Sequence, residues 1–168
     1  MQKIPELPDY RISIRSLLLR PNEKKDISLT VDGETAASYG LPCRVLPRIS
    51  GLLENRAGVL MMSYTLRCVP ELYCDRCLSQ TDMQIAAEFS HVIVTETASA
   101  DNDAEYLLAP DAMLDLGEVA MEDLRLSLPT KILCKPDCKG LCPVCGKNRN
   151  TEECTCSVGE QAITVEFA

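Results

Sequence analysis

Alternating apolar and polar residues fill the first half of the chain, a pattern that predicts β-strands. Residues 11–19 begin with this alternation, and residues 26–32 continue it up to the pair Asp32-Gly33, which is typical of a turn. Residues 83–94 show the same pattern. Because one set of side chains is apolar throughout, we expect these strands to form an antiparallel sheet with one buried face.

Two longer apolar stretches, residues 43–53 and 59–69, flank the segment ENRAG and predict a β-hairpin. Gly58 in that segment would supply the unusual backbone angle of the turn. Prolines border or interrupt the apolar stretches and predict sheet edges or bulges, because proline cannot donate a ladder hydrogen bond. These prolines are Pro42, Pro47 and Pro70.

The second half of the chain has a different pattern. Residues 97–105 are polar and predict a mobile loop. Asp115 and Glu118 resemble a capping box, and apolar residues with helical spacing follow them. We therefore expect one short helix near 116–128, which ends before Pro129 because a proline disfavours the helical conformation of the preceding residue.

Ten cysteines in a chain of 168 residues are the strongest signal in the composition. No apolar run approaches the length of a membrane span, and the N-terminal residues lack the apolar segment of a secretory signal. We therefore expect a cytoplasmic protein with no membrane partner, in which thiols stay reduced. In that compartment, ten cysteines favour metal or redox chemistry over a disulfide framework.

Six of the ten cysteines lie within residues 134–156. Cys142 and Cys145 have the C-x-x-C spacing of a zinc knuckle, because two thiolates in such a turn can reach one tetrahedral ion about 2.3 Å away. Cys154 and Cys156 follow closely enough to complete four ligands. All-cysteine sites are closed, whereas a catalytic zinc keeps one position open for water.

Cys74 and Cys77 form a second C-x-x-C pair, between two predicted strands. A thioredoxin-like redox pair would have a helix after it, and the segment that follows here predicts a strand instead. Together with Cys134 and Cys138 this pair supplies four more thiolates, so we predict two zinc ions, or at least one. A single site built from a different set of four cysteines remains an alternative.

The two remaining cysteines, Cys43 and Cys68, lie in predicted strands, where we expect them to act as small buried hydrophobic residues. The predicted fold class is α+β. An antiparallel sheet domain with one short helix would occupy residues 1–129, a zinc module packed on the sheet would occupy 130–157, and a terminal strand would occupy 158–168.

The net charge of −8 is unevenly distributed along the chain. Residues 96–123 contain nine acids and no Lys or Arg, which predicts a solvated face. Residues 131–150 contain one acid and five cations. The cations could screen the thiolates or bind RNA phosphates, and both interpretations stay open. These cations are Lys131, Lys135, Lys139, Lys147 and Arg149.

Sequence signatures of the common enzyme classes are absent. The chain contains neither G-x-x-x-x-G-K-[ST] nor G-x-S-x-G. Its single histidine, His91, lies in a predicted strand, where a structural role is expected. Aromatic residues make up 4% of the chain and tryptophan is absent, which disfavours a base-stacking platform. We therefore expect a protein without enzymatic activity.

In their order along the chain, these motifs resemble the YceD family, also called the large ribosomal RNA subunit accumulation proteins. The resemblance rests on CDRCL at 74–78, on Asp115-Leu116 before the helix, and on GLCPVCGKN at 140–148 followed by C-x-C. It implies a cytoplasmic, non-enzymatic factor in the synthesis, processing or stability of bacterial large-subunit (23S) rRNA. Its partner would be that rRNA or a pre-ribosome.

The chain departs from many relatives at Arg149, where they have leucine, and at its end, where they have a short basic or helical tail. Two other functions stay open. The first is a redox-responsive zinc switch whose thiolates release metal on oxidation. The second is an acidic adaptor that recruits a basic ribosomal protein or a nuclease without touching RNA.

Overall fold

The computed structural model describes residues 9–95 and 106–156 of the chain. The described residues divide into two compact units: the first lies within 1–71 and 83–129, and the second lies within 72–82 and 130–168. We predicted that residues 72–82 belong to the sheet domain, but they group with the cysteine-rich segment. The loop expected at 97–105 and the whole segment after 156, including the expected terminal strand, lie outside the described residues.

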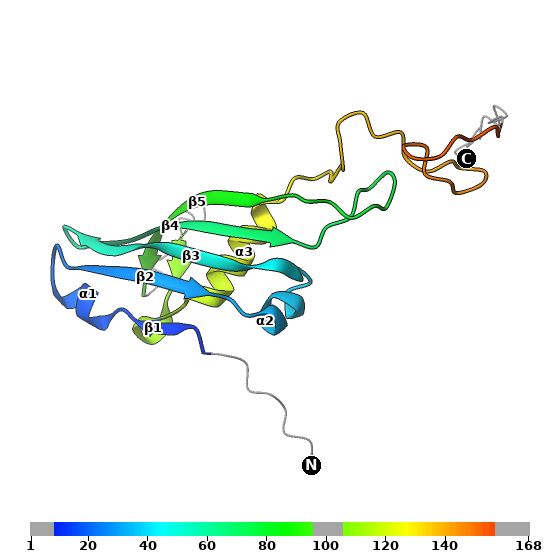
Figure 1. Cartoon of the computed structure of the whole chain (residues 1–168). Helices are drawn as coiled ribbons and strands as arrows, with labels where there is room; N and C mark the ends of the chain where they lie inside the picture. The colour runs from blue at the N-terminus through cyan, green and yellow to red at the C-terminus, as the bar shows by residue number, and fades with distance from the viewer. Residues whose placement is uncertain (1–8, 96–105, 157–168) are drawn as a thin grey trace, which may run out of the picture. The chain divides into compact units, whose positions relative to one another are not determined.

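The first unit is built on a five-stranded sheet with the strand order β2-β3-β4-β5-β6. Figure 1 shows β2 to β5 in this order. Neighbours from β2 to β5 are antiparallel, and β6 joins β5 in parallel. The predicted α+β fold class with an antiparallel sheet is therefore confirmed, apart from the parallel edge strand, which was not foreseen. The strands are β2 (Lys24–Thr30), β3 (Cys43–Arg56), β4 (Val59–Pro70), β5 (Ile85–Val94) and β6 (Tyr106–Leu108).

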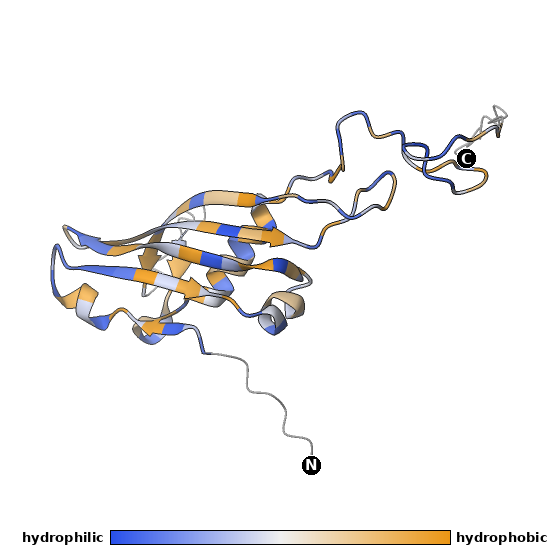
Figure 2. Ribbon diagram, in the orientation of Figure 1, coloured by the Kyte–Doolittle hydropathy of each residue, from blue (hydrophilic) through white to orange (hydrophobic). Residues whose placement is uncertain are grey.

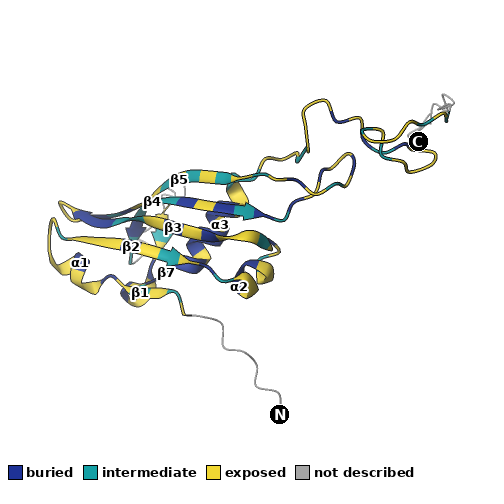
Figure 3. Cartoon of the chain, in the orientation of Figure 1, coloured by how far each residue is buried: buried dark blue, intermediate teal, exposed yellow. Residues whose placement is uncertain are grey.

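Apolar and polar bands alternate along these strands (Figure 2), and buried positions alternate with exposed ones in the same way (Figure 3). Helix α3 (Leu116–Ser127) covers the apolar face, where Leu53, Met62 and Leu66 of the sheet are fully buried together with Met121 and Leu124 of the helix. This is the core of the unit, since side chains of both layers are removed from water there.

Helix α3 agrees with its sequence signals. The Asp115 side chain accepts hydrogen bonds from the backbone N–H groups of Gly117 and Glu118, at 2.9 and 3.0 Å. This N-cap satisfies amides that have no partner within the helix. The helix ends at Ser127, two residues before Pro129, as predicted.

The strand predicted over residues 11–19 is wrong beyond its first three residues. Strand β1 (Arg11–Ser13) pairs with β7 (Met113–Asp115) in a separate two-stranded sheet, and helix α1 (Arg15–Leu19) follows. Ile14 and Leu17 are both fully buried. Residues three apart lie on one face of a helix but on opposite faces of a strand, so a helical turn buries both.

The turn predicted at Asp32-Gly33 is also wrong, because Asp32 is the N-cap of helix α2 (Gly33–Ser38). Its carboxylate accepts from the backbone N–H of Glu34 and Thr35. Hydrogen bonds from the hydroxyls of Thr35 and Tyr10 lower the pKa of Asp32 well below its usual range.

The β3–β4 hairpin is tighter than the segment ENRAG suggested, because β3 extends to Arg56 and leaves Ala57 and Gly58 as the turn. Both have positive φ, at 51° and 92°, as a two-residue hairpin turn requires. The pairing of β3 with β4 shifts register between Cys43 and Arg48. This confirms the bulge expected near Pro47.

His91 has the structural environment that was expected. Its Nε2 lies 2.6 Å from Asp123 Oδ2, and the Tyr64 hydroxyl donates to the same carboxylate oxygen. Burial, and then the hydrogen bond to Asp123, raise the pKa of Tyr64 far above its usual range.

The short 3-10 helix η1 (Pro110–Ala112) precedes β7. No helix among the described residues is long and apolar enough to cross a membrane.

Candidate metal centres

The second unit contains two loops of the same construction, one around each C-x-x-C pair. In the first, the backbone N–H of Cys74 bonds to Ser79 O at 2.8 Å and that of Leu78 bonds to Cys74 O at 2.9 Å. In the second, Cys142 and Gly146 make the equivalent bonds at 2.8 and 2.9 Å. Leu78 and Gly146 occupy the same position and both have positive φ. The two loops are therefore a local structural repeat.

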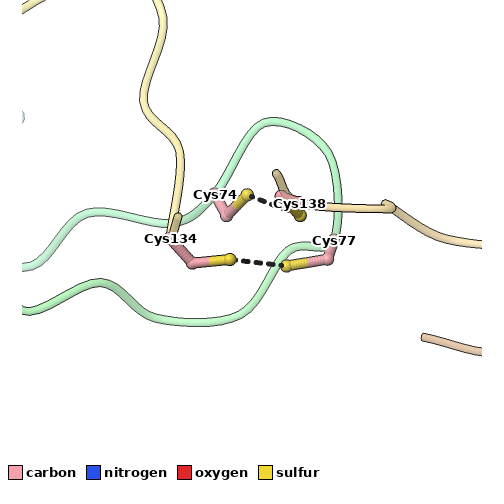
Figure 4. Close-up of side chains that lie close together, drawn as sticks. All are labelled: Cys74, Cys77, Cys134 and Cys138. Atoms are coloured by element: carbon pink, nitrogen blue, oxygen red, sulfur yellow. Dashed lines mark hydrogen bonds between the residues drawn. The ribbon is translucent and has the colours of Figure 1, made fainter. Parts of the chain in front are cut away.

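The first cluster combines the loop at 72–82 with the segment that follows the helix (Figure 4). Cys74 Sγ lies 3.7 Å from Cys138 Sγ, and Cys77 Sγ lies 3.6 Å from Cys134 Sγ. All four sulfurs lie within 4.8 Å of one another. Three of the four residues are buried, and Cys134 is exposed.

The second cluster lies closer to the C-terminus. Cys154 Sγ lies 3.3 Å from Cys142 Sγ and 3.5 Å from Cys145 Sγ, and Cys156 completes a set of four within 4.8 Å. Only Cys142 is buried here, while Cys145 is exposed and the other two are half-buried. The two clusters contain the eight cysteines in the division expected from their spacing.

These distances match a metal site better than disulfides. Four thiolates about 2.3 Å from a tetrahedral ion would lie roughly 3.8 Å from one another. A disulfide would require about 2.05 Å between sulfurs, and all ten cysteines are free. Each cluster could therefore bind one metal ion through four sulfurs.

Backbone amides stabilise a thiolate in each cluster. The amides of Cys145 and Val144 lower the pKa of Cys142 to about 6. Burial acts to raise the pKa of Cys74, but backbone amides, first that of Cys134, outweigh it and bring the pKa to about 6. Each loop thus presents one sulfur that is ionised at neutral pH, which is the form that binds metal.

A second sulfur in each cluster is held protonated when no cation is present. Desolvation among the other sulfurs raises the pKa of Cys134 to about 12, although the residue as a whole is exposed. Hydrogen bonds with Cys154 and Cys145 raise the pKa of Cys156 to about 12. Four crowded sulfurs cannot all ionise without a positive charge between them.

Polar side chains that the sequence reasoning did not single out join the chain segments of this unit. Asp75 Oδ2 accepts from the backbone N–H of Ile132 at 2.7 Å, and Arg76 Nη1 donates to Cys138 O at 2.9 Å. Asn150 Nδ2 donates to Cys138 Sγ at 3.3 Å. Asn150 comes from the loop of the second cluster and bonds to a sulfur of the first, so it links the two.

Two asparagines flank Arg149 and join the second loop to other segments of the unit. Asn148 Nδ2 donates to Ser79 Oγ at 3.2 Å, and Asn150 Oδ1 accepts from the backbone N–H of Lys139 at 2.9 Å. Asparagine after a C-x-x-C pair was visible in the sequence as part of the family resemblance. Its spacing alone does not reveal which distant atoms it would reach.

The five cations predicted near the cysteines are all exposed. Lys147 Nζ lies 3.9 Å from Glu152 Oε2. Within the described part of the chain, no ion pair involves the other four, which are Lys131, Lys135, Lys139 and Arg149. A Zn²⁺ ion with four thiolates would have a formal charge of about −2, so these cations can offset charge and still face solvent.

Cys43 and Cys68 take no part in either cluster. They lie on β3 and β4 of the first unit, where Cys68 is buried and Cys43 is half-buried. A hydrogen bond from Cys68 lowers the pKa of Cys43. The buried hydrophobic role expected for both fits Cys68 fully and Cys43 in part.

A family model described as large ribosomal RNA subunit accumulation protein YceD matches residues 62–166, which include all eight clustered cysteines. The chain belongs to the YceD family. The resemblance inferred from the motifs is thus confirmed.

The chain is also similar to two kinds of curated protein. A maize protein named large ribosomal RNA subunit accumulation protein YCED homolog 1, chloroplastic, is 24% identical over 177 residues, which is 87% of this chain and 60% of the relative. Uncharacterized proteins of Mycobacterium tuberculosis and Mycobacterium bovis are 30% identical over 76 residues, covering 44% of this chain and 37% of theirs. The chain thus spans less than two thirds of these relatives. No solved structure matches it.

Proposed function

We propose that this YceD protein is a non-enzymatic factor that supports the synthesis, processing or stability of large-subunit (23S) rRNA in the cytoplasm. In this proposal it carries two structural zinc ions. The observation that carries the proposal is the pair of four-sulfur clusters within the family's matched residues.

Zinc is the metal that this set of donors favours, because four soft thiolates in a tetrahedral arrangement select Zn²⁺ or an iron–sulfur cluster over hard cations. Cys74, Cys77, Cys134 and Cys138 would hold one ion. Cys142, Cys145, Cys154 and Cys156 would hold the other. Each ion would cross-link chain segments that otherwise share few apolar contacts.

A structural role rather than catalysis follows from the number of protein ligands. Four sulfurs fill a tetrahedral ion and leave no position for a substrate or an activated water. Small units with little core depend on such ions for stability. We therefore assign the metal to folding and shape, and we assign the contact with ribosomal particles to the surface of the unit.

The exposed cations of the second unit are the first candidates for contact with rRNA phosphates. Lys139 and Arg149 both lie beside the cysteine loops, since the Lys139 amide bonds to Asn150 and the Arg149 amide bonds to Gly140 O at 3.0 Å. Zinc would hold these backbone segments in place and thereby position the Cα atoms from which both cationic side chains extend.

A redox-responsive switch is a second candidate, favoured by the exposure of Cys145 in the second cluster. Exposed thiolates are the ones that oxidants reach first. The test is to treat the protein with peroxide. Release of one zinc ion together with loss of binding to ribosomal particles, both reversed by reduction, would support a switch over a factor that is always active.

The test uses a variant in which Lys139, Lys147 and Arg149 are replaced by Gln, supplied as the only copy in the cell. If these cations contact rRNA, zinc content stays normal while the level of large-subunit rRNA falls. The matched control replaces Arg15, Lys25 and Arg125, three exposed cations of the first unit, and removes the same charge.

Normal rRNA together with normal zinc in the first variant would show that its cations only screen thiolates. An unchanged rRNA level in cells that lack the protein altogether would refute the proposed function itself. Crosslinking that recovers a basic ribosomal protein or a nuclease but no RNA would favour the adaptor.

A further inference from the structure

The sheet of the first unit has a face opposite α3 that none of the described helices of this unit covers (Figure 1). The outward side chains form rows across the strands, as the strand register defines them. One row is Thr30, Arg48, Arg67 and Ala86, and the next is Ser28, Ser50, Thr65 and Glu88. Small hydroxyl side chains thus surround two arginines.

Arg48 and Arg67 lie directly opposite each other on β3 and β4. Side chains at such positions start about 5 Å apart, and like charges there destabilise the sheet. Both arginine side chains are exposed, and neither guanidinium group forms an ion pair or a hydrogen bond within the described residues. Two facing guanidinium groups without an acidic partner are an arrangement that an anion would stabilise.

A shallow hollow of about 770 Å³ lies over these arginines. Its lining includes the hydroxyls of Thr30, Ser50 and Thr65 beside Arg48 and Arg67, and it contains no acidic and no aromatic residue. A second hollow adjoins it, shares Ser50 and Thr65, and includes Glu88. The two arginines therefore lie in the first hollow, and the acidic Glu88 lies in the second.

We propose that Arg48 and Arg67 clamp one phosphate of a single-stranded RNA backbone in this hollow. Guanidinium groups are suited to this because their planar N–H donors match two phosphate oxygens at once. Hydroxyl groups of Ser and Thr donate to phosphate and sugar oxygens in the same way. This inference rests on the proposed function for the choice of RNA as the polyanion.

The absence of an aromatic side chain in the hollow sets the mode of binding. Bases bind exposed protein faces mainly by stacking on aromatic rings, and the hollow that contains both arginines offers none, whereas Tyr64 and Phe89 line only the adjoining hollow. Recognition would therefore address the backbone and be indifferent to base identity. Oligouridylate and oligoadenylate of equal length should bind with similar affinity.

The experiment measures binding of the full-length, zinc-loaded protein to fluorescent single-stranded oligouridylate of about 12 nucleotides, over a series of salt concentrations. Replacing Arg48 and Arg67 by Gln should weaken binding at least about tenfold at low salt, because charge-assisted hydrogen bonds are lost. The slope of log affinity against log salt should fall by about 0.7, the value for one phosphate on a single strand.

Two controls separate the clamp from bulk charge and from misfolding. The double substitution Arg15→Gln and Lys25→Gln removes the same charge elsewhere on the unit and should leave affinity within about twofold, since distant exposed charges are screened by salt. Replacing both arginines by Lys keeps the charge and the slope but loses the forked geometry, so its affinity should lie between those of the native protein and the Gln variant.

Equal affinity and slope for the Arg48/Arg67 Gln variant and the Arg15/Lys25 control would overturn the proposal. It would also be overturned if the native protein failed to bind the oligonucleotide. Tighter binding of an oligoglutamate peptide than of RNA, with the same dependence on both arginines, would assign the hollow to an acidic protein instead. These binding measurements do not involve the rRNA level in cells. The proposed function can therefore fail or hold independently of the clamp.

Discussion

Asp75 and Ile132 are joined by a reciprocal pair of hydrogen bonds. The Asp75 amide donates to Ile132 O at 2.8 Å, and the Asp75 carboxylate accepts from the Ile132 amide at 2.7 Å. This pair holds the first cysteine loop against the segment that leads to Cys134 and Cys138. The two bonds thus join the chain segments that carry the two halves of the first cluster.

The first prediction follows from this pair. Asp75→Ala should speed the loss of zinc from the first cluster, because the segment that leads to Cys134 would lose its bonds to the first loop, while Arg76 and Asn150 would still hold Cys138. The measurement is the rate of zinc transfer to a chromogenic chelator. Asp137→Ala removes an exposed acid of the same unit as a control, and equal rates for the two variants would refute the positioning role.

The second prediction concerns which residues depend on each ion. Structural zinc stabilises such modules by on the order of 10 kcal/mol. Cys142→Ser should therefore increase amide exchange in residues 141–156 and leave the sheet protected, whereas Cys77→Ser should act on 72–82 and 130–138. Cys43→Ser, outside both clusters, should change neither. The same exchange pattern for Cys77 and Cys142 would show that both serve one site.

The third prediction concerns pH. Cys74 and Cys142 have pKa values of about 6, while those of Cys134 and Cys156 are about 12. Above pH 6 one thiolate per cluster is already formed, so each zinc ion displaces roughly three protons. Below pH 6 it must displace about four, because binding requires deprotonated sulfurs.

Zinc affinity should consequently fall as pH falls, and fall more steeply below pH 6 than above it. Titration calorimetry in buffers of different ionisation enthalpy counts the protons released. A release that stays constant from pH 5 to pH 8 would contradict the assignment of the low pKa to one sulfur per loop.

The fourth prediction concerns helix α3. Asp115→Ala should lower the free energy of unfolding of the first unit by about 1 kcal/mol, since it removes the N-cap bonds to Gly117 and Glu118. Urea denaturation measures the change. Glu122→Ala, at an exposed position within the same helix, should have a much smaller effect, and comparable losses would argue against capping.

Sequence reasoning located β2 to β5 and α3 because their periodicity is long and their ends carry strong signals. It failed at α1 and α2 and at the three-residue strands β6 and β7, all of which are short. In residues 11–19 the alternation that begins the segment continues for too few residues to distinguish a strand from one helical turn that buries Ile14 and Leu17. At Asp32 the same Asp-Gly pair suits a turn and an N-cap, and only the partners Thr35 and Tyr10 decide between them.

The grouping of cysteines predicted from spacing matches the two clusters, because a four-sulfur set requires local pairs and each loop contains one. The contacts of Asn150 with Cys138 and of Asp75 with Ile132 were not predictable, since they join residues whose proximity depends on the complete chain path. The facing pair Arg48 and Arg67 likewise depends on strand register. A bulge near Pro47 adjusts that register, and no local signal specifies by how much.

The most direct test of the account is the zinc content of the purified native protein, measured by elemental analysis together with a count of protected thiols. We expect about two zinc ions per chain and eight thiols that become reactive only when a chelator removes the metal, whereas the reactivity of Cys43 and of the buried Cys68 should not depend on the metal. One ion per chain would refute the division into two clusters. No metal, with the clustered thiols freely reactive, would contradict the zinc centres altogether.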